Sequence, residues 1–277
     1  MWLINASTLS LEHFYGDDIP AYAILSHTWG EGEMSFREFT QIQNVGTTSK
    51  AGYRKIAATC ELALKDGCPY VWVDTVCIDK ASSAELTEAI NSMFGWYRRS
   101  QICYAYLSDF TLDIADVSPR PALFEDDFRK CRWFTRGWCL QELLAPRHLQ
   151  FLNQQWQEIG TKSMLSRLIS DITGVPEAVL VMPPEKEIHE YPIAARISWI
   201  AKRRTTRIED ISYSLLGILG VNMPMLYGEG PMAFIRLQEE VIRKFNDLSI
   251  FAWTGEATAS GFMPILSASP SSFASNL

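Results

Sequence analysis

Short β-rich runs alternate with amphipathic segments through the first half of the chain, and this alternation is the strongest constraint on its fold. Three runs have the composition and length of β-strands: 21–27, 70–79 and 101–110. Two segments between them have helical periodicity: 49–67, which stops at a glycine, and 82–100, which opens with a capping Ser82. Strands that alternate with helices pair in parallel through right-handed crossovers. We therefore predict an α/β fold with a parallel sheet flanked by helices.

Three further segments complete the first half. Residues 111–130 are rich in Pro and Asp and predict a loop, RGWCLQELLAP (136–146) predicts a helix, and the apolar run HLQFLN (148–153) follows. The helix starts after the third strand, so its first turns are expected to face the crevice at the carboxyl ends of the strands.

Helical periodicity, interrupted by Pro and Gly, dominates the second half of the chain. It covers four segments: 162–174, 192–203, 207–220 and 230–245. We predict an all-helical subdomain packed on the sheet, with SIFAW (249–253) as one further strand. The predicted domains are an α/β core at 1–160, a helical subdomain at 161–255, and a Ser/Ala-rich tail or linker to the rest of a longer protein at 256–277.

Charge and hydropathy exclude several classes of partner. The formal charge is −7, from 25 basic and 32 acidic residues, so no polycation is present to neutralise a nucleic acid backbone. No apolar run approaches the roughly 18–20 residues that span a bilayer, and the N-terminus lacks the pattern of a signal peptide. We expect a cytoplasmic protein with no membrane span.

The cysteine pattern argues against a metal site. The six cysteines lie in apolar stretches, without a C-x-x-C pair or an adjacent histidine: Cys60, Cys68, Cys77, Cys103, Cys131 and Cys139. We expect all six to be reduced, because buried thiols are common in reducing compartments.

The carboxyl ends of the predicted strands carry the residues most suited to binding a ligand, since open parallel sheets present functional loops there. The first strand leads into SHTWGEGE, in which Ser26, His27 and Thr28, followed by Gly30, can offer backbone amides and hydroxyls to a pyrophosphate. No G-x-G-x-x-G or Walker sequence supports this assignment.

Two aspartates follow the second strand. Asp74 and Asp79 can bond a ribose or a neighbouring loop, and structural capping is the favoured role. The third strand ends at SDF (108–110), which adds a further polar loop at the same edge.

A single glutamate interrupts the apolar helix at 136–146. Residues four apart share a helix face, so Trp138 lies beside Glu142. A carboxylate in such surroundings is either well paired, with Arg136 or Arg147 as candidate partners, or reactive. The sequence alone leaves both alternatives open.

Three tryptophans offer flat surfaces on which adenine or nicotinamide can stack: Trp29, Trp133 and Trp138. Packing in the core is the commoner role of a tryptophan and the alternative for each of them. Cys139 with His27 suggests a nucleophile, although a buried packing cysteine is favoured. The basic run 201–207 suggests a phosphate site, although a solvated helix end is favoured.

Six ordered blocks resemble the fungal heterokaryon-incompatibility (HET) domain, from about Tyr22 to Trp253. They are YAILSHTWG, YVWVDTVCID, AELTEAINSMFGWYRRSQICYAYLSD, WFTRGWCLQELLAP, EDISYSLLGILGVNMPMLYGEG and AFIRLQEEVIRKFNDLSIFAW. The resemblance implies a role in programmed cell death when genetically different filamentous fungi fuse. It also implies an attached or partner nucleotide-binding receptor.

A more distant resemblance connects the chain with Toll/interleukin-1 receptor (TIR) domains. Four segments follow the TIR order at similar intervals: 23–29, 73–79, 88–108 and the Trp-Cys-Leu-x-Glu-Leu helix at 138–143. In catalytic TIR domains the glutamate of that helix cleaves NAD+, and the matching position is Glu142. The longer loop at 111–135 and the helical second half depart from the TIR pattern, so the substrate contacts transfer less safely than the glutamate.

The two resemblances together imply a TIR-like enzyme that cleaves NAD+ as its substrate, needs no cofactor or metal, and depends on self-association. The alternative is a non-catalytic adaptor that signals cell death through homotypic contacts. Because nicotinamide leaves as a neutral group, one carboxylate that stabilises the developing oxocarbenium ion can suffice, whereas ordinary glycosidases use two.

Overall fold

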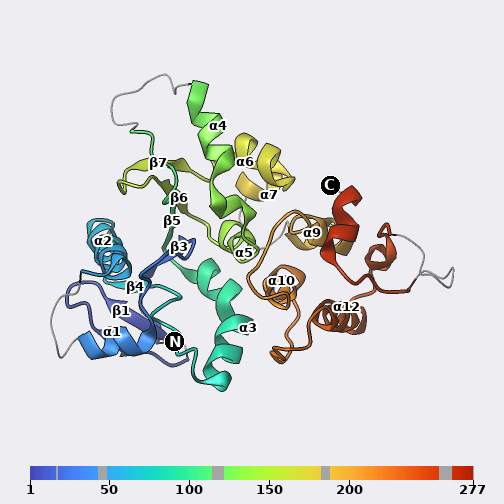
Figure 1. Cartoon of the computed structure of the whole chain (residues 1–277), viewed down its shortest axis with the longest axis horizontal. Coiled ribbons are helices and arrows are strands. Elements are labelled where there is room, and N and C mark those ends of the chain that lie inside the picture. The colour runs from blue at the N-terminus through green and yellow to red at the C-terminus, as the bar shows by residue number, and fades with distance from the viewer. Residues whose placement is uncertain (17, 43–48, 114–121, 182–187, 256–263, 277) are drawn as a thin grey trace. The chain divides into compact units, whose positions relative to one another are not determined.

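The computed structural model describes residues 1–16, 18–42, 49–113, 122–181, 188–255 and 264–276 (Figure 1). Its contacts divide the chain into two compact units. The sheet unit comprises Met1–Ala89, Trp96–Cys131 and Pro146–Thr161, and the helical unit comprises Ile90–Gly95, Arg132–Ala145 and Lys162–Leu277. Each unit is therefore assembled from three separate stretches of the sequence.

The sheet unit is built on a seven-stranded sheet with the order β2-β1-β4-β3-β5-β6-β7. Its strands are β1 (Trp2–Asn5), β2 (Leu11–His13), β3 (Tyr22–His27), β4 (Tyr70–Trp72), β5 (Ile102–Tyr106), β6 (Leu149–Leu152) and β7 (Glu158–Thr161). The four central strands, β4-β3-β5-β6, are parallel, which confirms the predicted α/β fold. Antiparallel β1, β2 and β7 extend both edges, and the sequence patterns did not predict these three strands.

Four helices accompany the sheet: α1 (Phe36–Ile42), α2 (Ala51–Lys65), α3 (Ser83–Arg99) and α4 (Ala122–Lys130). The predicted caps of two of them are present. Gly67, with a φ of 74°, follows the end of α2, and the Ser82 side chain accepts a hydrogen bond from the Glu85 amide at the start of α3. These local signals explain why both helices occur where the sequence predicts them.

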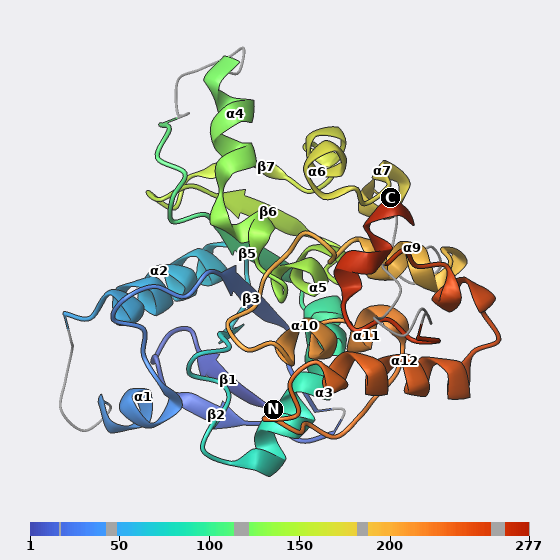
Figure 2. The same cartoon turned by 45° about the vertical axis from the view of Figure 1, so that its right-hand side comes forward.

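The helices cover both faces of the sheet, as the alternation of side chains along the strands shows. Tyr104 on β5 donates a hydrogen bond to Asp66 just beyond α2, so α2 lies on the face of Tyr104. Figure 2 shows α2 beside the strands of the sheet. Trp72 packs against Trp96 of α3, and Phe151 packs against Phe128 of α4. Because Trp72 and Phe151 belong to the opposite face through the strand register, α3 and α4 cover that face.

Two predictions for the sheet unit, the end of one strand and the extent of one loop, are wrong. The strand predicted over 70–79 ends at Trp72, because the chain then turns and the amides of Val76 and Cys77 bond back to the Val73 carbonyl. The loop predicted over 111–130 contains α4, in which buried Phe124 and Phe128 stack one helical turn apart. Residues 114–121 of that prediction lie outside the described residues.

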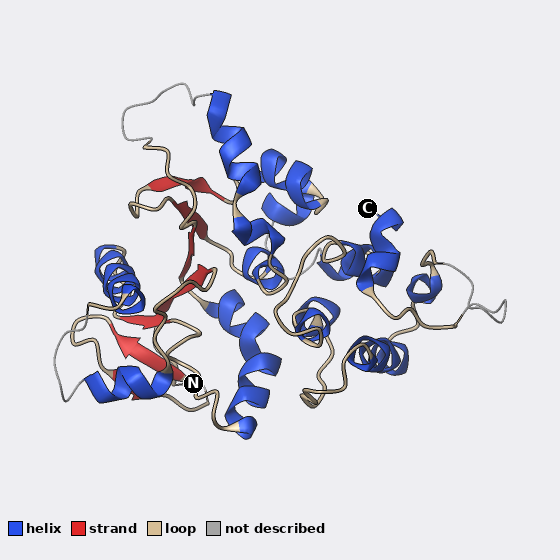
Figure 3. Cartoon of the chain, in the orientation of Figure 1, coloured by secondary structure: helices blue, strands red, loops and turns tan. Residues whose placement is uncertain are grey.

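The helical unit contains short helices joined by turns, and its described part contains no strand (Figure 3). Its α-helices are α5 (Cys139–Leu144), α6 (Ser166–Thr173), α7 (Glu177–Val181), α9 (Ile193–Ser198), α10 (Asp210–Tyr213), α11 (Leu216–Leu219) and α12 (Met232–Lys244). Its 3-10 helices are η1 (Arg132–Thr135), η2 (Ile188–Glu190), η3 (Leu248–Phe251) and η4 (Pro270–Asn276). The helices predicted from periodicity are present, although the segment 207–220 forms two short helices where one was predicted.

The strand predicted over 249–253 is also wrong. Residues Leu248–Phe251 form η3, and the Asp247 side chain caps it by accepting a hydrogen bond from the Ser249 amide. A short apolar run does not by itself distinguish a strand from a helical turn. Here the Asp247 cap stabilises the helical turn.

The end of the chain packs on α12. Phe273 is fully buried and lies edge-on to Phe234 of α12, with 6.2 Å between the ring centroids. The Gln238 side chain donates to the Ser267 carbonyl and accepts from the Ser267 amide. Residues 256–263 of the predicted tail lie outside the described residues.

All six cysteines are buried free thiols. Among the helices of the described segments, none has the length and apolar character needed to cross a membrane.

Candidate functional site

The loop after β3 is held against the start of α2 by a close backbone contact. The Gly52 amide donates to the Gly32 carbonyl at 3.0 Å, and Gly32 has a φ of 74°. A Cβ at Gly52 would lie 2.7 Å from the Met34 backbone nitrogen, so only glycine permits this approach. The two glycines fix the path of the loop that carries the predicted ligand-binding residues.

The five predicted residues at the end of β3 fall into two groups. Ser26, His27 and Thr28 are buried, whereas the side chain of Trp29 is in part exposed, with 49% of the residue's surface accessible, and Gly30 is exposed. No atom would come within 4 Å of a Cβ placed at Gly30. Within this group only Trp29 and Gly30 offer substantial surface to a ligand.

A charged cluster surrounds the buried His27 ring. Its Nε2 lies 3.7 Å from a Glu33 carboxylate oxygen and 3.9 Å from an Asp74 oxygen, which is too far for hydrogen bonds. The Lys55 ammonium forms an ion pair with Glu33. Burial, reinforced by the charge of Lys55, lowers the pKa of His27 to about 3. The imidazole is therefore neutral at physiological pH.

The two aspartates after β4 both bond to nearby protein groups. An Asp74 oxygen accepts a hydrogen bond of 2.9 Å from the Trp29 indole, which joins the loops after β3 and β4. An Asp79 oxygen accepts from the Ala81 amide at 3.0 Å, and the Asp79 amide donates to the Glu85 side chain. Asp79 therefore stabilises the turn that precedes α3, whose N-cap is Ser82, and Asp74 bonds a neighbouring loop.

The loops after β3 and β4, with the start of α1, enclose a pocket of about 320 Å³ in the sheet unit. It lies at the carboxyl edge of the parallel strands, where ligands commonly bind in such sheets. Its lining residues are Trp29, Glu33, Met34, Ser35, Phe36, Arg37, Glu38, Thr75, Ile78, Asp79, Lys80 and Ala81. Of the predicted site residues, Trp29 and Asp79 line this pocket.

Lys80 gives the pocket a feature that the sequence did not reveal. Its ammonium lies 3.7 Å from the centroid of the Trp29 ring and so occupies one face of the indole by a cation–π contact. A base that stacks on Trp29 must use the other face or displace Lys80. The pocket thus combines an aromatic surface, the cations Lys80 and Arg37, and the carboxylates Glu33, Glu38 and Asp79. Glu33 and Glu38 form ion pairs with Lys55 and Lys50, and the indole, the two cations and Asp79 are groups suited to a nucleotide.

Glu142 lies in the helical unit, within α5, where every residue is buried and Glu142 itself is 7% exposed. The Cys139 thiol is hydrogen-bonded to its carboxylate, and the charge of the buried Arg203 guanidinium acts on both residues. Burial lowers the pKa of Arg203 to about 10, so the guanidinium stays charged at neutral pH. Arg203 also donates to the Arg136 carbonyl at 3.0 Å.

The contacts around Glu142 bear on two alternatives from the sequence, the role of the basic run 201–207 and the reactivity of Cys139. Arg203, which was grouped with a solvated basic run, is a buried neighbour of Glu142, whereas Lys202, Arg204 and Arg207 are exposed as expected. Burial and the Glu142 carboxylate raise the pKa of the Cys139 thiol well above its ordinary value, which argues against a nucleophilic thiolate.

The two predicted tryptophans of the helical unit differ in accessibility. Trp133 is fully buried and lies edge-on to Phe134 at 5.2 Å, so it exposes no face on which a base can stack. Trp138 is half-buried and its indole donates a hydrogen bond to the Asp210 carboxylate. Trp133 therefore acts as a core residue, while Trp138 keeps part of its surface accessible.

Some residues of these clusters carried a sequence signal and others did not. Glu33 ends the loop SHTWGEGE after β3, and Lys80 directly follows Asp79 in the loop after β4, so their place beside the site follows from the strand ends. Lys55 and Arg203 have no such signal, because only the tertiary fold brings a helix residue and a turn residue against buried polar groups.

Comparison with known proteins places the chain in a family. Residues 22–122 match the family described as heterokaryon incompatibility protein (HET), and residues 232–274 match a domain of unknown function (DUF8212). The vegetative incompatibility protein HET-E-1 of Podospora anserina is 45% identical over 226 residues, which cover 80% of this chain. The chain spans 16% of the length of that relative. No solved structure matches it. The chain therefore carries a domain of the heterokaryon-incompatibility (HET) family.

Proposed function

We propose that the chain is a cell-death effector domain of fungal heterokaryon incompatibility. The family match over residues 22–122 and the 45% identity to a vegetative incompatibility protein support this role. We further propose that it acts in the cytoplasm, self-associates when activated, and is attached to or partnered by a nucleotide-binding receptor. The short share of the relative's length that it spans fits a domain that works within a larger protein.

The proposed activity is cleavage of NAD+ to nicotinamide and ADP-ribose products. The pocket at the carboxyl edge of the sheet is the observation that carries the nucleotide part of this proposal. Trp29 offers an indole face, Lys80 and Arg37 offer positive charge for phosphate, and Asp79 offers a carboxylate for ribose hydroxyls. At about 320 Å³ the pocket has room for part of a dinucleotide.

Glu142 is the proposed catalytic residue. Cleavage of the bond between nicotinamide and ribose expels a neutral pyridine, so no general acid is required, and a positive charge develops on the ribose. A carboxylate that is largely removed from water stabilises such a charge more strongly than a solvated one. With 7% exposure, Glu142 meets that electrostatic requirement.

The same surroundings favour a second candidate function, a non-catalytic adaptor that signals through homotypic contacts. Cys139 is hydrogen-bonded to Glu142, and the charge of Arg203 acts on it, as expected for a carboxylate that stabilises the fold. In this alternative the Glu142 carboxylate stabilises the packing of α5, and the pocket of the sheet unit takes no part in signalling.

One experiment separates the two functions. Purified protein with an artificial clustering tag is incubated with NAD+, and nicotinamide release is followed by chromatography for the wild type, Glu142→Gln and Glu239→Gln. Glu239 is an exposed residue of α12 and supplies the matched control. The catalytic proposal expects at least a hundredfold loss of rate in Glu142→Gln, because the substitution keeps the shape of the side chain and removes its charge. The rate of the control should not change.

The opposite result is equally clear. If the clustered wild type releases no nicotinamide, while wild type and Glu142→Gln both still kill fungal cells, the NAD+ proposal fails and the adaptor function takes its place. Equal rates of nicotinamide release by wild type and Glu142→Gln would retain the enzyme but exclude Glu142 as its catalytic residue.

A further inference from the structure

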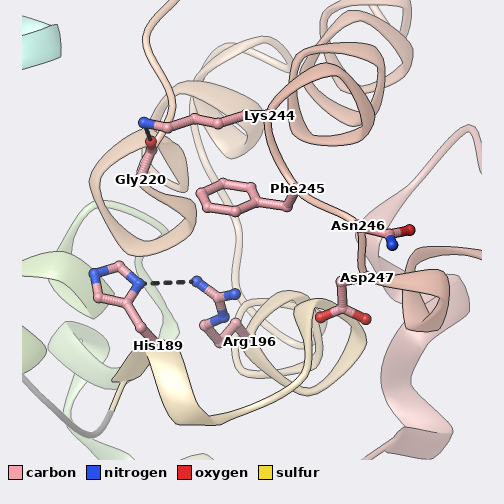
Figure 4. Close-up of a pocket in the computed structure, with 7 residues that line it drawn as sticks. All are labelled: His189, Arg196, Gly220, Lys244, Phe245, Asn246 and Asp247. Atoms are coloured by element: carbon pink, nitrogen blue, oxygen red, sulfur yellow. Dashed lines mark hydrogen bonds between the residues drawn. The ribbon is translucent and has the colours of Figure 1, made fainter.

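A second pocket lies within the helical unit, and none of its lining residues belongs to the candidate site described above. Its volume is about 450 Å³, in the range of small-molecule sites. It is lined by His189, Arg196, Gly220, Lys244, Phe245, Asn246 and Asp247 (Figure 4). These residues come from η2, α9, the end of α11, the end of α12 and the segment that follows it, so distant parts of the sequence converge on the pocket.

Arg196 is the central polar group of this pocket. It is 4% exposed, and one of its terminal nitrogens contacts the His189 Nδ1 at 3.3 Å and donates to the Ile218 carbonyl at 3.1 Å. Its Nε–H is buried without a hydrogen-bond partner among the described residues. Burying a cation is costly, and the charge of an anion in the pocket that Arg196 lines would offset that cost.

The charges around Arg196 favour an anion. Lys244, at the end of α12, places its ammonium beside the Gly220 carbonyl on one side of the pocket, as Figure 4 shows. Asp247 is the one carboxylate among the lining residues, and its two oxygens accept from the amides of Ile193 and Ser249. The lining thus contains two cations and one carboxylate, whose oxygens already accept from backbone amides, so its net charge is positive.

The aromatic ring of Phe245 narrows the class of ligand. It is half-buried and lies above the Arg196 guanidinium in Figure 4. Gly220, with a φ of 72°, has no side chain, and a Cβ there would contact both the His189 ring and the Phe245 ring at 3.6 Å. The absent side chain keeps space between the two rings, where a flat group can enter.

We propose that this pocket binds a mononucleotide, with the phosphate held by Arg196 and Lys244 and the base against Phe245. Charge-assisted hydrogen bonds from a guanidinium and an ammonium are the usual means of holding a phosphate, and bases stack on aromatic rings. The site goes beyond the proposed cleavage of NAD+, because it uses none of the residues assigned to that reaction. Four of its lining residues, Lys244, Phe245, Asn246 and Asp247, fall within the matched domain of unknown function.

The test uses the whole 277-residue chain and isothermal titration calorimetry. The probes are AMP, ribose 5-phosphate, inorganic phosphate and adenosine, so that the contributions of base, sugar and phosphate separate. The variants are Lys244→Met, Phe245→Leu and the control Arg243→Met. Arg243 neighbours Lys244 on α12 but pairs with Glu240 at the surface, so the control makes the same change of charge one residue away.

We expect AMP to bind the wild type and the Arg243→Met control equally. Binding should be about tenfold weaker in Lys244→Met, because one charge-assisted hydrogen bond is lost. Phe245→Leu should weaken the binding of AMP but leave the binding of inorganic phosphate unchanged.

Three results would overturn the proposal. The first is equal affinity of the wild type for adenosine and AMP. The second is an equal loss of affinity for AMP in Lys244→Met and Arg243→Met. The third is that no probe binds the wild type. The third result applies only if circular dichroism shows the protein folded. An Arg196→Met variant that folds and still binds AMP would also exclude the site.

Discussion

His27 shows at the scale of one residue how burial sets chemistry at the edge of the sheet. Its ring is buried next to the ion pair of Glu33 and Lys55, and its pKa falls to about 3. A histidine in that state cannot supply a proton at neutral pH. Its neighbours Glu33 and Asp74 approach without hydrogen-bonding it, so the ring acts as a neutral spacer between charged groups.

Stability should therefore fall in mild acid because of His27. The folded pKa of about 3 lies below the unfolded value of 6.5, so the unfolded chain takes up the proton first as the pH falls through this window. The resulting loss between pH 7 and pH 5 is about 2 kcal/mol in the free energy of unfolding. In His27→Gln this part of the pH dependence should disappear.

Urea unfolding at pH 7, 6 and 5 measures this effect. The matched control is His148→Gln, because His148 is exposed. The explanation would be wrong if His27→Gln kept the full pH dependence of the wild type, or if the control removed it as well.

At the scale of elements, one glycine decides how the loop after β3 meets α2. The Gly52 position is so close to the loop that a Cβ would come within 2.7–2.9 Å of backbone atoms of Gly32, Glu33 and Met34. Backbone atoms cannot rotate away as a side chain can. Gly52→Ala should therefore destabilise the protein by about 2 kcal/mol, the usual size of an overpacking effect.

Gly30→Ala is the appropriate comparison, because open space surrounds Gly30 in the same loop. It should change the free energy of unfolding by less than about 0.5 kcal/mol. Urea denaturation of both variants measures the difference, and similar stabilities would show that the loop moves to accept the methyl group.

Elements with strong local signals were predictable from the sequence, and the others were not. β3, α2, α3 and β5 have apolar periodicity, and the two helices have clear end signals, with Gly67 after α2 and Ser82 at the start of α3. β1 and β2 are too short to show periodicity, and they acquire stability by pairing with β4 and with each other. α4 was missed because acidic residues in its sequence conceal the spacing of Phe124 and Phe128.

The pocket of the sheet unit was predictable only from residues that directly follow a strand. Trp29 and Asp79 follow β3 and β4 and line the pocket, as parallel strands require. Arg196 and Lys244 lie far apart in the sequence, in helices with no polar motif, so only the folded chain reveals the second pocket.

At the scale of the whole molecule, the two units interleave along the chain. The helical unit includes 90–95 and 132–145, and the sheet unit is completed only by 146–161. The core predicted at 1–160 includes α5, a fully buried helix that belongs to the helical unit. Lys162, which lies beyond that core, donates a hydrogen bond to the Leu143 carbonyl of α5.

A fragment of residues 1–161 should therefore be poorly soluble and lack a cooperative unfolding transition. Truncation removes most of the helical unit and leaves the apolar residues of α5 accessible to water. Size-exclusion chromatography and urea unfolding, compared with the full chain, measure this. A fragment that stays monomeric and unfolds cooperatively would instead support an independent domain that ends at residue 160.

The interleaving also sets a rule for exchanging sequence between relatives. A chimera with a breakpoint inside 90–161 replaces parts of both units at once, so a change in its behaviour cannot be traced to either. Breakpoints before residue 90 or after residue 161 divide only one unit, and they keep the alternating middle of the chain from a single parent. In evolution, recombination that respects those limits would be the kind that leaves a folded protein.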